Sequence, residues 1–280
     1  MRARPLLVAA AAAALVVGVA AGPAEAKKPS GRHGSGATAT WAPASSAQVH
    51  PGVMTYTDGA QCTANFVFTD GATTYLGQAA HCSGTGGSTE TNGCDSGSLP
   101  LGTPVTFNGF TGTMVYNSWL AMQKAGEKDA NTCDYNDLAL IKLPADALAT
   151  TNPSVPFFGG PTGLGSGTTS GDDVYSYQNS SLRLGISQLS PKQGVSLGDT
   201  GGGWSTTVYT LTPGIPGDSG SGFLDATGKA FGVLSTITIA PLAGSNGVGN
   251  LAKEIAYAQT HGVAGLSVVP GTEPFTPGLV

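Results

Sequence analysis

The stretch "GIPGDSGSGF", residues Gly214 to Phe223, raises the most specific question about this chain. It places Ser219 among glycines and beside an aspartate, in a segment whose neighbours are typical of β-strands. Glycine weakens a strand because it has no side chain to pack and loses the most freedom on folding. Such a run is expected where the backbone bends sharply or another group approaches closely. In a chain with 43 glycines, a plain surface turn is the alternative, and Ser219 alone does not decide.

The first 26 residues are expected to be a secretory signal peptide. Arg2 and Arg4 precede an Ala/Val/Leu run over residues 6–21, and Ala24-Glu25-Ala26 supplies a small-x-small cleavage pattern. A membrane-anchoring helix is the competing interpretation, but the run is short for a span of about 20 residues and is dominated by alanine. We therefore expect a secreted, extracellular protein with no membrane attachment once the signal is removed.

The composition limits the partners that the chain can bind. The formal net charge is −5, only 10% of the residues are charged, and Lys and Arg form no cluster. A nucleic-acid or anionic-membrane surface is therefore not expected. Abundant Gly, Ser, Thr and Ala, with 40% hydrophobic residues dispersed regularly, favour an extracellular all-β protein over a disordered chain.

Short runs of β-branched and aromatic residues between turn signals predict two β units. Residues 27–48 are expected to be a flexible leader or short pro-segment, and residues 151–171 a connector between barrel one (49–150) and barrel two (172–248). The expected strands of barrel one are Ala64–Phe68, Thr73–Leu76, Val105–Phe107, Thr113–Tyr116 and Leu138–Leu143. Those of barrel two are Val174–Tyr177, Leu182–Ile186, Trp204–Leu211 and Ala230–Ile239.

One helix is predicted over residues 250–261. Asn250 can cap it, Leu251, Ile255 and Ala258 share one face, and Gly262 can end it. The tail, residues 263–280, contains three prolines and is expected to be poorly ordered.

Four cysteines are expected to form two disulfides, because export permits them and the count is even. They are Cys62, Cys82, Cys94 and Cys133, and the sequence alone permits three pairings. A zinc site is the rival, but no C-x-x-C or His-x-x-x-His spacing supports one.

Two further segments contain residues suited to proton transfer. In "YLGQAAHCSG", His81 follows an apolar strand, and a bridge from Cys82 to Cys62 would fix the position of its ring. Histidine exchanges protons near neutral pH, so His81 is a candidate for proton transfer. A structural role is the alternative. In "DYNDLALIKLP", Asp137 precedes an apolar strand where a buried carboxylate needs a hydrogen-bond donor such as a histidine Nδ1–H. A simple turn role, which Asp134 would fill equally well, is the alternative there. A calcium loop lacks its glycine and terminal glutamate.

Taken together, "AAHC", "DLALIKL" and "GDSGSG" resemble the three signature segments of chymotrypsin/trypsin-like serine proteases, in that family's order. The resemblance covers roughly residues 49–262 and is closest to the Gly-rich, disulfide-poor secreted bacterial members. It implies two antiparallel β-barrels of the trypsin-like type packed together, with a C-terminal helix. Of the three cysteine pairings, we favour Cys62–Cys82 with Cys94–Cys133.

The resemblance also implies a catalytic triad. Ser219 would be the nucleophile, His81 the base, Asp137 the residue that orients the base, and the Gly217 and Ser219 amides the oxyanion hole. The implied function is a secreted serine endopeptidase acting on a protein or peptide substrate, as a monomer and without a cofactor or metal. A non-catalytic binding protein on the same fold is the alternative. An α/β-hydrolase esterase is disfavoured because Ser221 replaces the second glycine of G-x-S-x-G.

Specificity and activation are less defined. By resemblance, Pro213 would lie at the base of the primary pocket, and Ser235 and Ile237 would form a wall, which predicts an uncharged P1 side chain. Relatives often pair the aspartate matching Asp218 with a new N-terminus after cleavage before an Ile-Val-Gly-Gly type sequence, which this chain lacks. We expect no such activation cleavage. Asp218 then needs another partner, and Arg183, Lys192 or hydrogen-bond donors are candidates.

Overall fold

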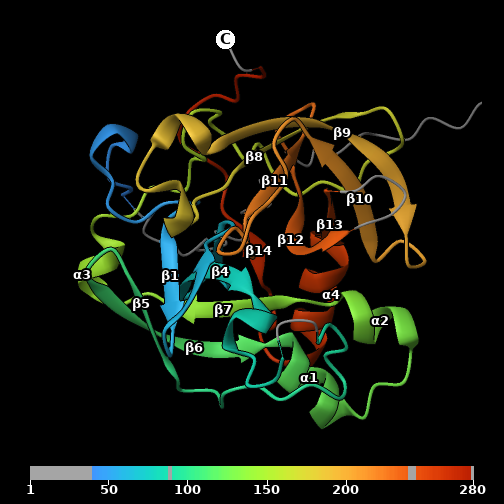
Figure 1. Cartoon of the computed structure of the whole chain (residues 1–280). Helices are drawn as coiled ribbons and strands as arrows, with labels where there is room; N and C mark the ends of the chain where they lie inside the picture. The colour runs from blue at the N-terminus through green and yellow to red at the C-terminus, as the bar shows by residue number, and fades with distance from the viewer. Residues whose placement is uncertain (1–39, 88–89, 239–243, 279–280) are drawn as a thin grey trace, which may run out of the picture. The chain divides into compact units, whose positions relative to one another are not determined.

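Strands in the computed structural model pair antiparallel throughout the described part of the chain, in two sheets (Figure 1). The structure describes residues 40–87, 90–238 and 244–278, all within the unit Thr38–Val280. The expected signal peptide and most of the expected leader lie outside the described residues. Among the helices of the described ranges, none has the length and apolar character that crossing a membrane requires.

The first sheet has eight strands and the second is a closed barrel of six. In spatial order, the first sheet contains β14 (Ser267–Val268), β3 (Val67–Thr69), β4 (Thr74–Ala79), β7 (Leu138–Lys142), β6 (Phe110–Asn117), β5 (Pro104–Phe107), β1 (Met54–Thr57) and β2 (Ala60–Thr63). The barrel contains β10 (Ser205–Thr210), β13 (Ser245–Asn250), β12 (Ala230–Thr238), β11 (Gly222–Asp225), β8 (Asp173–Tyr177) and β9 (Pro191–Thr200). The all-β architecture with two barrel-like sheets is confirmed.

A continuous apolar core joins the two sheets. One cluster contains residues from both halves of the fold. Phe66 and Leu138 come from the half with the first sheet, and they pack with Tyr175, Leu224 and Val233 of the barrel. Each sheet also has its own interior cluster. Loops at the ends of strands from both sheets are therefore held in fixed positions relative to one another.

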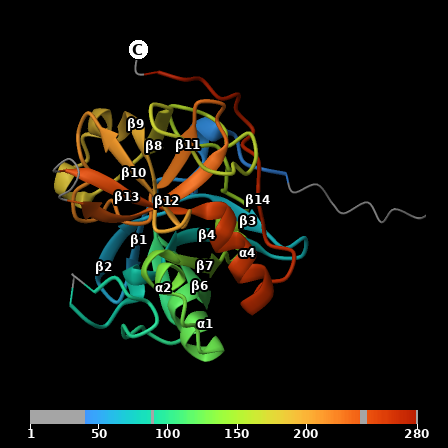
Figure 2. The ribbon, with the colours of Figure 1, turned by 90° about the vertical axis from the view of Figure 1, so that its right-hand side faces the viewer.

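The helix near the C-terminus is confirmed as α4 (Leu251–His261). The Asn250 side chain accepts a hydrogen bond from the Lys253 amide, which satisfies one of the free N–H groups of the first turn. Leu251, Ile255 and Ala258 are buried on one face, against the core that contains Leu138 of β7. Figure 2 shows α4 beside the strands of the first sheet. The helix thereby reaches the segment that precedes β7.

Three short α-helices and four 3-10 turns were not predicted. They are α1 (Ser118–Ala125), α2 (Ala130–Tyr135), α3 (Ala145–Leu148), η1 (Ala44–Ser46), η2 (Ala80–Ser83), η3 (Ser181–Arg183) and η4 (Ser187–Leu189). The first of them is fixed by its cap, since the Asn117 side chain accepts from the amides of Trp119 and Leu120. Because each helix is too short to show a helical repeat, apolar periodicity did not reveal them.

One expectation for the second half of the chain is wrong. Residues 182–186 form no strand: Leu182 is 63% exposed and Leu184 86%, in the loop around η3 and η4. The strand that closes the barrel is instead β9, which contains few apolar residues.

The tail, expected to be poorly ordered, is held by backbone hydrogen bonds over its described part. Val269 N donates to Val67 O at 2.9 Å, Gly271 N to Pro161 O at 2.8 Å, and Thr276 N to Phe158 O at 2.7 Å. Its prolines do not prevent these contacts, because the amides that bond belong to other residues.

Candidate active site

His81 and Asp137 meet at the ends of two neighbouring strands. His81 lies in η2 directly after β4, and Asp137 directly precedes β7, which pairs with β4. Asp137 Oδ2 lies 2.6 Å from His81 Nδ1, and Oδ1 accepts from the His81 backbone amide at 2.9 Å. The carboxylate thus holds both the ring and the backbone of the histidine, as expected for a residue that orients a base.

A third donor, which the sequence did not reveal in this role, comes from the barrel. The Ser235 hydroxyl donates to Asp137 Oδ2 at 2.6 Å. With its carboxylate only 4% exposed, Asp137 needs such donors to remain in the core of the protein. Burial alone would lower the pKa of His81, but the negative charge of Asp137 and its hydrogen bond to the ring outweigh burial and raise the pKa above 6.5.

Ser219 lies in the loop before β11, opposite the histidine, and lines the same cleft as His81 and Asp137. Among the described residues, its Oγ has no hydrogen-bond partner, while its carbonyl accepts from Thr63 N at 2.8 Å. Hydrogen bonds between a nucleophile and its base are often long in unliganded sites and shorten when substrate binds. The structure therefore brings the three residues to one cleft without a direct Ser219–His81 bond.

The two amides expected to form an oxyanion hole have no acceptor among the described residues. A trans peptide directs its C=O and N–H to opposite sides. The Pro216 carbonyl accepts from Ser180 Oγ at 2.5 Å, and the Asp218 carbonyl accepts from Ser221 Oγ at 2.6 Å and Ser221 N at 3.0 Å. The N–H groups of the same two peptide units, those of Gly217 and Ser219, point away from these bonds and remain available to an anion.

The backbone conformation and close packing of this loop require glycine at two positions, which answers the question raised by "GIPGDSGSGF". Gly217 has φ +96° and Gly220 φ +89°, in the region that L-residues with a Cβ disfavour. At Gly220, a Cβ would lie 2.5 Å from Thr63 O and 2.8 Å from Ala79 N. The first sheet therefore approaches this loop too closely for any larger residue, which places Ser219 beside the end of β4.

Asp218 is fully buried behind this loop and pairs with Arg183, one of the candidates named from the sequence. Arg183 Nη1 contacts Oδ1, and Nη2 donates to Oδ2 at 2.6 Å. Oδ2 also accepts from Ile215 N at 2.9 Å. Lys192 is nearby: burial, reinforced by the charge of Arg183, lowers its pKa to about 8 although Asp218 opposes this. The partner of Asp218 is thus a side chain from within the chain.

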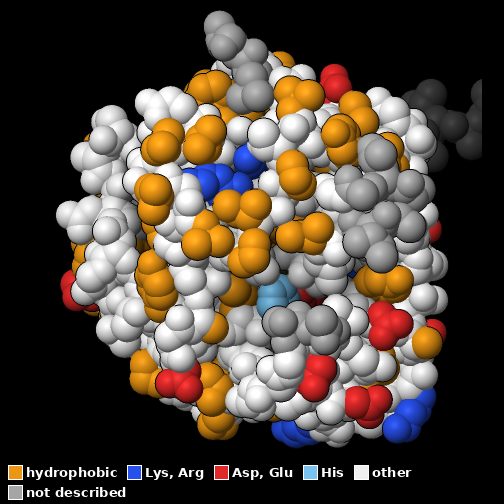
Figure 3. All heavy atoms as spheres, viewed as in Figure 1, with side chains coloured by type: hydrophobic (Ala, Val, Ile, Leu, Met, Phe, Trp, Pro, Cys, Tyr) orange, Lys and Arg blue, Asp and Glu red, His pale blue; other side chains and the backbone are white. Residues whose placement is uncertain are grey.

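The cleft around Ser219 has a volume of about 690 Å³. Figure 3 shows a histidine in a hollow of this face, with hydrophobic side chains gathered beside it. The wall formed by residues 234–237 includes Ser235 and Ile237, and Ile237 is 49% exposed. Pro213, expected at the pocket base, is exposed and does not line the cleft. Glu90 and Trp119 line it from the first sheet's side, which sequence reasoning did not anticipate.

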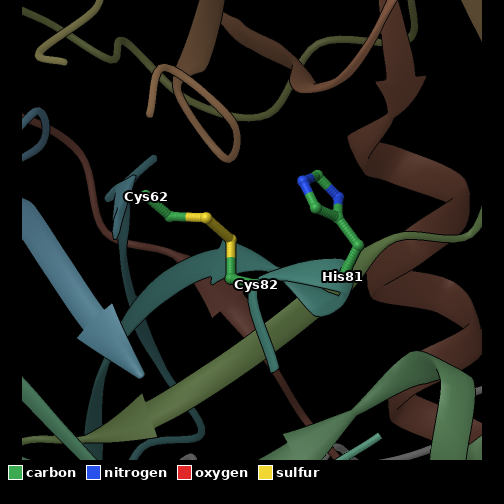
Figure 4. Close-up of side chains that lie close together, drawn as sticks. All are labelled: Cys62, His81 and Cys82. Atoms are coloured by element: carbon green, nitrogen blue, oxygen red, sulfur yellow. A yellow bond between two sulfur atoms is a disulfide. The ribbon is translucent and has the colours of Figure 1, made fainter. Parts of the chain in front are cut away.

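The cysteines pair as Cys62–Cys82 and Cys94–Cys133, which confirms the favoured pairing. Cys62, Cys82 and His81 lie close enough together to resemble a metal-binding trio. Figure 4 shows the two sulfurs bonded to each other, with the His81 ring beside them. Zinc binds thiolates, and a disulfide has none, so this trio has no thiolate to offer a metal.

Comparison with known proteins supports the fold. Neither a protein-family model nor a curated protein sequence matches the chain. Among solved structures, Protease A of Thermobifida fusca is similar with a TM-score of 0.51 and 17% identity, over 80% of this chain and 99% of that one. A glutamic acid-specific serine protease (TM-score 0.49, 17% identity, 79% and 100% covered) and Nocardiopsis protease (0.49, 17%, 79% and 98%) are also similar. The chain has the trypsin-like fold of bacterial serine proteases, as the resemblance implied.

Proposed function

We propose that this protein is a secreted serine endopeptidase that uses Ser219, His81 and Asp137 as its triad. One observation carries the proposal: two unpaired amides, of Gly217 and Ser219, flank the buried Asp218 in the cleft that also holds the His81–Asp137 pair. An activated hydroxyl beside preorganised N–H donors is what acyl transfer requires.

The proposed reaction proceeds through an acyl-enzyme. Ser219 Oγ attacks the peptide carbonyl while its proton passes to His81 Nε2, and the oxyanion is stabilised by the Gly217 and Ser219 amides. His81 then gives that proton to the leaving amine. A water molecule, deprotonated by the same ring, hydrolyses the ester, and the serine recovers its proton. Asp137 keeps the Nδ1–H tautomer oriented and stabilises the imidazolium.

An uncharged P1 side chain fits the cleft wall. Ile215, Leu234 and Ile237 are apolar, and residues 235 and 236 are hydroxylic, so this wall presents no charge to a substrate. We expect the Ile237 side chain, which lines the cleft, to limit the size of the P1 side chain. Profiling with a mixed peptide library tests this: we expect small or medium uncharged P1 residues, and Ile237→Gly should favour larger side chains by about tenfold. A preference for Arg or Glu at P1 would contradict it.

A non-catalytic binding protein on the same fold is the second candidate, because Ser219 Oγ makes no hydrogen bond to His81. The deciding experiment is labelling with a fluorophosphonate probe, which reacts only with an activated serine. We expect strong labelling that Ser219→Ala and His81→Ala abolish, and that the matched surface variants Ser267→Ala and His261→Ala retain. A folded, disulfide-bonded protein that does not label would favour the binding protein.

A further inference from the structure

A second buried carboxyl group lies directly behind the His81–Asp137 pair. Glu254, in the first turn of α4, is fully buried, and its Oε1 accepts from the Asp137 backbone amide at 3.1 Å. The position of Oε1 is confined, since a Cβ on Gly249 would lie only 2.6 Å from it. Among the described residues, the one hydrogen bond of this acid supports the backbone of Asp137.

Several buried polar atoms in this part of the molecule, one of them on Glu254 itself, have no partner among the described residues. Glu254 Oε2, the Tyr116 hydroxyl and both side-chain atoms of Asn136 are buried and lack a hydrogen bond among the described residues. Tyr116 is close enough to Glu254 to interact with it electrostatically, and Asn136 directly precedes Asp137. Buried polar groups normally find partners, in many proteins through internal water. Buried polar groups without partners are therefore present on this side of Asp137.

The charges around Glu254 favour its neutral form. Burial raises its pKa to about 8; the hydrogen bond from the Asp137 amide opposes this, and the negative charge of Asp137 adds to it. Tyr116 from β6 and Tyr257 from α4 are the other titratable groups on this side; burial raises the pKa of both, that of Tyr257 to about 12. Lys253 points elsewhere, to Gly202 O at 2.8 Å. No described cation pairs with Glu254.

We propose that Glu254 is a positioning residue whose neutral carboxyl group holds Asp137 in place and keeps a single negative charge behind His81. This inference rests on the proposed function. When Glu254 ionises, a second negative charge beside Asp137 repels its carboxylate, so Asp137 no longer holds the His81 ring in its productive orientation. Reactivity of Ser219 should then fall on the alkaline side.

The test compares Glu254→Gln and Glu254→Leu with the wild type and with Glu273→Gln, the same chemical change at an exposed site. The first readout is the rate of fluorophosphonate labelling from pH 5 to pH 10. We expect the wild type and Glu273→Gln to lose reactivity above about pH 8, as the pKa of Glu254 requires. Glu254→Gln keeps the acceptor and cannot ionise, so its plateau should extend by a pH unit or more. Glu254→Leu, which loses the acceptor, should label at least tenfold more slowly at pH 7.

A second readout, thermal unfolding against pH, does not depend on catalysis. A carboxyl group whose pKa is 4.5 when unfolded and about 8 when folded loses its contribution to stability as pH rises between these values. The Tm of the wild type should therefore fall between pH 5 and pH 8 relative to that of Glu254→Gln. Equal alkaline limits and equal Tm profiles in these two proteins would overturn the proposal. Absent labelling with divergent Tm profiles would overturn the proposed function but support the buried neutral acid. Glu254→Gln keeps the test decisive if Glu254→Leu does not fold.

Discussion

Replacing Arg183 by methionine removes the buried charge that balances Asp218 while keeping an unbranched apolar stem. Arg183 is 6% exposed and Asp218 is fully buried, so neither group can turn to water. The variant leaves the carboxylate with the Ile215 amide and with Lys192 nearby. Breaking a buried ion pair by removing one partner costs about 3–5 kcal/mol, because the remaining charge stays desolvated.

This loss in the free energy of unfolding is large enough to detect by thermal unfolding. In domains of 150–250 residues, 1 kcal/mol corresponds to about 2–4 °C, so Arg183→Met should lower the Tm by roughly 6–20 °C. Lys192, which can approach Asp218, should hold the change toward the lower end. Because Asp218 lies between the Gly217 and Ser219 amides, fluorophosphonate labelling should also fall, by about tenfold or more, at temperatures where the variant is still folded.

Two further variants serve as controls for the loss of the buried ion pair. Lys229→Met removes an exposed cation and should change neither the Tm nor labelling. Arg183→Met combined with Asp218→Asn removes the orphaned charge, so it should recover part of the Tm without recovering labelling. A Tm for Arg183→Met within 2 °C of the wild type would show that the Arg183–Asp218 ion pair does not stabilise the loop that contains Ser219.

Three other outcomes follow from the geometry. Replacing Cys94 and Cys133 by serine opens a loop with a sequence separation of 39, which should cost about 4 kcal/mol and appear as a lower Tm, with labelling kept in the cold. Ser180→Ala frees the Pro216 carbonyl and should reduce labelling by up to about 100-fold through the oxyanion hole, with little change in probe binding. The pH below which the labelling rate falls should lie above 6.5, because the pKa of His81 is raised and only the neutral ring is a base. Asp137→Asn should move this pH below 6.5, since burial alone lowers the pKa of His81.

The features that sequence predicted well have short-range chemical causes. That His81, Asp137 and Ser219 lie in one cleft was expected, because each follows or precedes a strand, and small residues flank His81 and Ser219. The terminal helix α4 has a cap, an apolar face and a terminating glycine, all within one short stretch. Local rules of this kind can be read directly from a chain.

The features that sequence missed depend on long-range contacts. Strand β9 has a low apolar content, and its buried Lys192 ammonium contacts Thr212, just after the neighbouring strand β10; the local pattern does not show this contact. Leu182 and Leu184 have strand-forming character, but their loop is shaped by Arg183, which turns inward to Asp218. Nothing in the local pattern distinguishes such an arginine from an exposed one.

The supporting residues of the site were missed for the same reason. Ser235 was assigned to the substrate pocket by resemblance; it does line the cleft, and its hydroxyl also donates to Asp137, which the resemblance did not indicate. Nothing local marks Glu254 as buried, because negative charge is common in the first turn of a helix. Its burial follows only from the packing of α4 against the segment before β7, which no periodicity encodes.

The arrangement around Asp218 also bears on activation. A trypsin-type ion pair needs a new N-terminal amine, whereas the Arg183 guanidinium is an internal part of the folded chain. The same loop supplies Ser180, which fixes the Pro216 carbonyl and so turns the Gly217 amide toward the cleft. Within the described residues, Ser180 thus binds the Pro216 carbonyl and Arg183 binds the Asp218 carboxylate, on either side of the expected oxyanion hole. We therefore expect Ser219 to react as soon as the barrel closes, and reactivity that appears only after cleavage within residues 27–60 would contradict this.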